Sequence, residues 1–135
     1  MNWKRFALAV VAVLILNNIA GFVIHGMLLQ ADYAHYPNLL RTQEDATNYF
    51  QWMLLNFLVF SVAFVWIYAN GVEDKPWVGQ GLRFGVAVWL LTSVAGFLTY
   101  YAVQPWGGEV VVKQILYELP RALALGLAAA AIYRK

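Results

Sequence analysis

The residues of this chain with the clearest chemical potential are ionisable side chains inside otherwise apolar segments. Glu118 and Arg121 stand three residues apart within residues 110–133, so on a helix they share one face and can form an ion pair. An isolated charge at the centre of a bilayer costs at least about 2.5–3.5 kcal/mol, and pairing offsets much of that cost. Pro120, between the two, removes a backbone donor and loosens the helix. Ionisable groups at this depth are candidates for a ligand, proton or ion site.

Polar residues of the other apolar segments fall at a similar depth, counted at about 1.5 Å per residue along each expected helix. They are Asn17, Asn18, Asn56, Thr92 and Ser93. We expect them to form an inward-facing polar layer centred on Glu118 and Arg121. Two interpretations stay open: the layer holds the helices together around a neutralised ion pair, or it lines an outward-opening cavity for a ligand, proton or ion.

His25 lies roughly 10 Å outward of the membrane centre, estimated from the helix rise, on the face shared by Asn18 and Gly21. It can act as a pH switch, ligate a metal together with Glu118, or simply hydrogen-bond a loop. No second histidine lies within an apolar segment, so a bis-histidine haem is not expected. We expect neither a metal site nor a cofactor.

Several chemistries have no signature in this chain. There is no cysteine, which excludes disulfides, thiol catalysis and thiolate metal sites. There is also no glycine-rich phosphate loop, no G-x-S-x-G and no H-E-x-x-H. The nine Lys and Arg residues are scattered without a basic run, so nucleic acid is not an expected partner.

The elements that must position the polar residues are long apolar segments. Apolar residues make up 62% of the chain and charged residues 12%, against about 25% charged in soluble domains. A membrane-spanning helix needs roughly 20 mainly apolar residues, and four segments qualify: 6–29, 49–69, 84–103 and 110–133. We therefore predict an all-α integral membrane protein, a single four-helix bundle over residues 1–135.

The distribution of Lys and Arg predicts the orientation of the bundle. With a cytoplasmic N-terminus, six of these residues lie on the cytoplasmic side and two on the other, as the positive-inside rule requires. Both termini are then cytoplasmic. Short connections and small size favour a bacterial inner membrane.

Small residues spaced by four allow helix backbones to approach closely in lipid. Gly81 and Gly85 form such a pair, and Ala122, Gly126 and Ala130 form a stripe in the fourth segment. The pattern predicts either helix packing within the chain or the interface of a homo-oligomer.

The layout resembles that of small four-span bacterial membrane proteins of unassigned function, the domain-of-unknown-function 1761 type. The similar features are Gly21-Phe22-Val23-Ile24-His25-Gly26 followed by Leu28, Leu29 and Tyr33, then Gly79-Gln80-Gly81-Leu82-Arg83-Phe84-Gly85 with Trp89, and the small residues ending the fourth segment with Gly126. The resemblance implies an inner-membrane four-helix protein and transfers no catalytic residue.

Three hypotheses for function follow. The leading one is a noncatalytic membrane protein that binds a lipid-like or small ligand in its outer half, or acts as an oligomeric or accessory subunit. The second is a small transporter or channel that uses Glu118 and Arg121. The third is a membrane enzyme acting on lipid or quinone, with Glu118 and His25 as acid and base, which requires both to face one cavity.

Overall fold

The computed structural model describes all 135 residues, and every regular element in it is helical. Four helical stretches are long and apolar enough to cross a membrane: Trp3–Leu28, Phe50–Gly71, Trp77–Val103 and Gly108–Ile132. The four predicted segments are therefore confirmed, with ends that differ by a few residues. The third differs most, because its helix begins directly after Pro76, whose fixed φ suits the residue before a helix.

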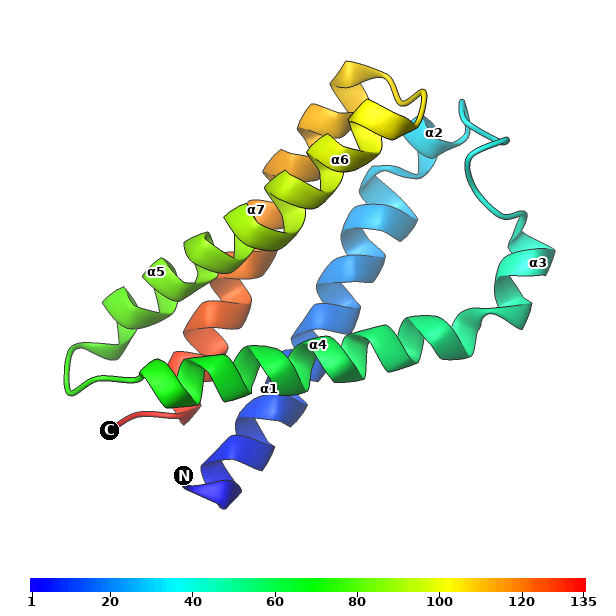
Figure 1. Cartoon of the computed structure of the whole chain (residues 1–135). Coiled ribbons are helices and arrows are strands. Elements are labelled where there is room, and N and C mark those ends of the chain that lie inside the picture. Colours follow the sequence, from blue (N-terminus) through cyan, green and yellow to red (C-terminus); the bar gives the residue numbers. More distant parts are fainter.

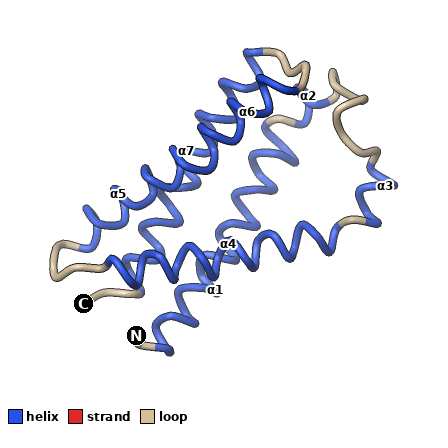
Figure 2. The backbone as a smooth tube through the Cα atoms, in the orientation of Figure 1, coloured by secondary structure: helices blue, strands red, loops and turns tan.

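Figures 1 and 2 show how these stretches are arranged. The first consists of α1 (Trp3–Gly21) and η1 (Phe22–Leu28), the second of α4 (Phe50–Gly71) and the fourth of α7 (Gly108–Ile132). The third consists of α5 (Trp77–Trp89), η2 (Leu90–Val94) and α6 (Ala95–Val103). Two short helices, α2 (Gln30–Tyr33) and α3 (Gln43–Asn48), lie in the connection to α4. Both chain termini lie at one end of the molecule, here called the termini end, and the connection with α2 and α3 lies at the other, the loop end.

The molecule buries few residues for its size. Only 24 of its 135 residues are buried, so most of the apolar side chains face outward. The outward-facing ones come from every long helix, for example Leu8, Ile15, Val59, Leu91, Val103 and Leu116. Water cannot solvate such a surface favourably, whereas lipid can, which agrees with four membrane-spanning helices.

The closest packing is between α5 and α7, along the small residues singled out above. A Cβ atom at Gly81 would lie 2.7 Å from the carbonyl oxygen of Gly126, and one at Gly85 would lie 2.6 Å from that of Ala122. The two backbones therefore touch, which only glycine permits at these positions. Of the two interpretations of this pattern, packing within the chain is the one the structure contains.

The long helices are in contact at the termini end, and α4 separates from the others toward the loop end. An apolar core of α1, α4 and α7 residues fills the termini end, including Val13, Phe64, Val65 and Leu125. All buried residues of α4 lie in its second half, from Ser61 onward. The first half of α4 diverges from the other helices (Figure 1). The bundle is thus open at the loop end between α4 and the other helices.

Candidate functional site

A π-helical segment, η1, brings His25 onto the face of the first helix that contacts α7. Eight residues of α-helix separate Asn17 from His25 and would rotate the side chain by about 800°, roughly 80° beyond two full turns. The wider turns of η1, seen in the bond from the Leu29 N–H to the Ile24 carbonyl at 2.9 Å, rotate less per residue. His25 therefore returns to the face of Asn17. Such π-helical insertions occur often at functional sites.

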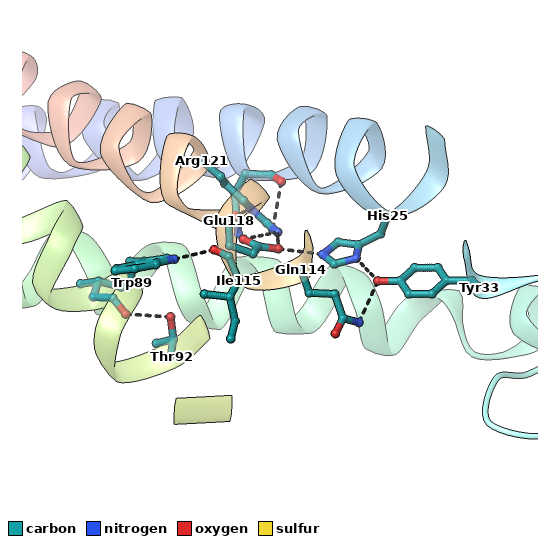
Figure 3. Close-up of polar contacts among 10 residues, drawn as sticks. His25, Tyr33, Trp89, Thr92, Gln114, Ile115, Glu118 and Arg121 are labelled. Atoms are coloured by element: carbon teal, nitrogen blue, oxygen red, sulfur yellow. Dashed lines mark hydrogen bonds and ion pairs between the residues drawn. The ribbon is translucent and has the colours of Figure 1, made fainter. Parts of the chain in front are cut away.

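Four side chains form a continuous hydrogen-bonded chain from the loop end to the middle of the molecule (Figure 3). The Tyr33 hydroxyl lies 2.6 Å from His25 Nδ1, and His25 Nε2 lies 2.7 Å from Glu118 Oε1. Arg121 Nη1 donates to Glu118 Oε1 at 2.9 Å and to Oε2 at 3.2 Å. The predicted ion pair between Glu118 and Arg121 is therefore present, and it is buried, with side chains only 9% and 12% exposed.

The hydrogen-bond partners indicate how protons can be arranged along this series of hydrogen-bonded side chains. A neutral His25 with its proton on Nε2 donates to the Glu118 carboxylate and accepts on Nδ1 from the Tyr33 hydroxyl. The Tyr33 oxygen in turn accepts from Gln114 Nε2 at 3.1 Å. Both ring nitrogens of His25 are thus occupied, one by Tyr33 and one by Glu118. The neutral tautomer satisfies every bond, and the cluster of Glu118, Arg121 and His25 then has no net charge.

Arg121 is anchored on α1 as well as on α7. Its Nε donates to Asn17 Oδ1 at 2.8 Å, and its Nη2 donates to the Asn17 carbonyl oxygen at 3.2 Å. Gly21 makes this approach feasible, since a Cβ there would lie 3.0 Å from Arg121 Nη2. A guanidinium has five N–H donors, and the protein accepts four hydrogen bonds from it. At least one N–H is therefore left for a ligand or water.

Tyr33 and Gln114 belong to this site, although sequence reasoning did not place them there. Burial raises the pKa of Tyr33 above its ordinary value of 10.0, so at neutral pH it is a phenol that can donate to His25. Gln114 carries a visible signal, because it lies one helical turn before Glu118 in an apolar segment. Tyr33 has no such signal, since it reaches the site only because α2 folds back over the bundle.

An open cleft of about 810 Å³ lies beside this cluster, between the first helix and the diverging half of α4. Arg121, Asn18 and Asn56 form its polar inner end, and His25 lines it further toward the loop end. Its apolar walls are formed by Ile19, Phe22, Phe50, Met53 and Phe57. A smaller cavity of about 190 Å³ continues beneath it and shares Asn56 and Arg121. Both volumes adjoin the guanidinium that has an unused donor.

The remaining predicted polar residues line these two volumes with hydrogen-bonding capacity to spare. Asn56 is exposed and makes no hydrogen bond within the protein, and neither does Ser93, which lines the smaller cavity. Asn18 uses one amide proton on the Leu14 carbonyl at 2.8 Å. Thr92 donates to the Val88 carbonyl at 2.8 Å, one turn back in its own helix. Some hydrogen-bonding groups of the polar layer are thus paired within the protein, and others are free to bind a ligand in these two volumes.

Trp89 supports the site from the side of α5. Its indole N–H donates to the Ile115 carbonyl of α7 at 2.8 Å, one turn before the position where Pro120 interrupts the helix ladder. The bond fixes the α5–α7 pair at the depth of Glu118 (Figure 3). No group of three or more His, Asp or Glu side chains comes together in the molecule.

No family model, no curated protein and no solved structure matches this chain.

Proposed function

We propose that the protein is a noncatalytic integral membrane protein that binds an amphipathic, lipid-like small molecule in the cleft between the first helix and α4. We place it in a bacterial inner membrane with both termini cytoplasmic, so that the cleft lies in the outer half of the bilayer. The observation that carries the proposal is the 810 Å³ cleft with an incompletely used guanidinium at its inner end. Small-molecule sites are typically clefts of about 300–1,000 Å³ with apolar walls and a few convergent polar groups.

The lining divides the cleft into a part for a head group and a part for a tail. Arg121 lies next to the centre of α7, and Asn56 faces it from α4. Toward the loop end the walls become apolar, and Phe22 and Phe50 are 67% and 58% exposed. A ligand with a polar group at the membrane centre and an apolar chain along these rings matches both parts. It can enter sideways from lipid.

The packing favours binding over conduction. The polar residues end at the apolar core of the termini end, where Val13, Val65 and Ala129 are completely buried. A transporter or channel would need this core to open. Binding in the cleft needs no such rearrangement.

A second candidate, a membrane enzyme acting on lipid or quinone, is favoured by one observation. His25 is joined to Glu118 by a bond of 2.7 Å and to Tyr33 by a bond of 2.6 Å. In this arrangement the Glu118 carboxylate orients the imidazole, and the imidazole can accept a proton from the Tyr33 hydroxyl. The two candidates differ in the fate of the ligand, which an enzyme changes and a binding protein does not.

The test is native mass spectrometry of the protein released from lipid nanodiscs. We expect one discrete bound mass on the wild type and its loss from Asn56→Leu, because the Asn56 side chain lines the cleft and makes no hydrogen bond within the protein. Asn70→Leu is the matched control: the same substitution in the same helix, away from the cleft. It should keep the bound mass. A wild type without any bound mass, or an equal mass on Asn56→Leu, would refute the proposal, and a mass that changes during incubation would favour the enzyme.

A further inference from the structure

We infer that the head group of the bound molecule is uncharged and offers a hydrogen-bond acceptor, as an alcohol, ester or ketone does. The inference rests on the proposed function and narrows its ligand class. Two independent observations carry it: the charge of the groups around the polar end of the cleft, and their unused donors and acceptors.

The polar end of the cleft is electrically neutral. On α7, Glu118 and Arg121 neutralise each other at 2.9 Å, and both ring nitrogens of His25 are already occupied by Tyr33 and Glu118. The facing part of α4 contributes Asn56, and η2 contributes hydroxyl groups only. No formal charge is left to neutralise a charged ligand.

The nearest other ionisable groups are already paired. Lys113 Nζ lies 2.9 Å from Asp32 Oδ1 and 3.5 Å from Glu109 Oε1, and none of the three lines the cleft. A charged head group would therefore enter the membrane centre without a counter-charge. That costs roughly a hundredfold or more in affinity.

The unused hydrogen-bonding groups define what the head group must offer. Arg121 has at least one free N–H, and the side-chain amide of Asn56, which lines the cleft, makes no hydrogen bond within the protein. A guanidinium N–H requires an acceptor, whereas an amide can both donate and accept. An oxygen atom of an alcohol, ester or ketone meets the first requirement, and an alcohol also donates to the Asn56 carbonyl.

The experiment uses three probes with one alkyl chain and permanently different charges: octadecanol, octadecyl sulfonate and octadecyltrimethylammonium. Each is titrated into the full-length protein in nanodiscs, and the dissociation constant is measured by native mass spectrometry. Wild type is compared with Asn56→Leu, and with Met53→Trp, which narrows the cleft from its apolar wall. The difference between wild type and variant removes nonspecific partitioning.

We expect octadecanol to bind the wild type roughly a hundredfold more tightly than either charged probe, and both variants to lose this preference. In the opposite result, the sulfonate or the ammonium probe binds the wild type as tightly as octadecanol or more tightly, and loses this binding in the variants. That result would overturn the uncharged head group but would still support a binding cleft. If no probe distinguishes wild type from both variants, the binding function itself is refuted.

Discussion

The contact between α5 and α7 gives the strongest single test of the packing that holds the site. Gly126 of α7 faces Gly81 of α5 so closely that a Cβ atom at Gly126 would lie 2.2 Å from the Gly81 carbonyl oxygen. Ordinary contact begins at 3.4 Å. The obstacle is backbone, so no side chain can turn away to make room. In Gly126→Ala the two helices must therefore separate along their whole interface.

The size of the effect follows from two opposing contributions. Inserting a methyl group into a filled contact costs about 1–3 kcal/mol, while alanine stabilises a helix by about 1 kcal/mol relative to glycine. We expect Gly126→Ala to be destabilised by roughly 1–2 kcal/mol, since a backbone obstacle places the cost near the upper end. Gly96 of α6 is the matched control, because nothing lies within 4 Å of a Cβ there. Gly96→Ala should gain about 0.5–1 kcal/mol.

The assay is reversible unfolding by sodium dodecyl sulfate in mixed micelles, followed by tryptophan fluorescence and helical circular dichroism. The two substitutions are chemically identical and both lie inside helices, so their difference, roughly 2 kcal/mol, reports the contact alone. If Gly126→Ala proves as stable as Gly96→Ala, the close α5–α7 approach is wrong.

Two further predictions concern charged groups. Glu118→Gln leaves the Arg121 charge without its partner and should cost about 3–5 kcal/mol of stability. The control is Glu109→Gln, which should change stability by less than about 0.5 kcal/mol in the same assay, because the Glu109 side chain is 84% exposed. Equal effects of the two substitutions would contradict a buried ion pair. At the termini end, Glu73 accepts a hydrogen bond from Lys75, which lowers the pKa of Glu73 below its ordinary value of 4.5. The stabilisation that ionised Glu73 gives the folded protein is therefore present above about pH 4.5 and is lost as the pH falls through the lowered pKa. Glu73→Gln should accordingly lose less stability on acidification than the wild type does. An equal loss in the two proteins would refute this contribution.

Local chemistry determined the parts of this protein that could be predicted from the sequence. Four apolar stretches of roughly 20 residues predict four long helices because backbone groups in lipid must bond within their own segment. The ion pair of Glu118 and Arg121 follows from a separation of three residues, which places both on one helix face. The small residues of the α5–α7 contact were visible in the sequence, but the sequence did not decide between packing within the chain and the interface of a homo-oligomer.

The tertiary structure alone decided how these parts form a cleft. The position of His25 depends on the π-helical turns of η1. Tyr33 meets His25 only because α2 folds back over the bundle, where Tyr33 also contacts Gln114, 81 residues away in the sequence. The divergence of α4, which opens the cleft beside Asn56, depends on how its second half packs against α1 and, through Phe64 and Tyr68, against Phe84 of α5. None of these has a local signature, because a helix period specifies which face is apolar and leaves open which neighbour that face meets, at what angle and over what length.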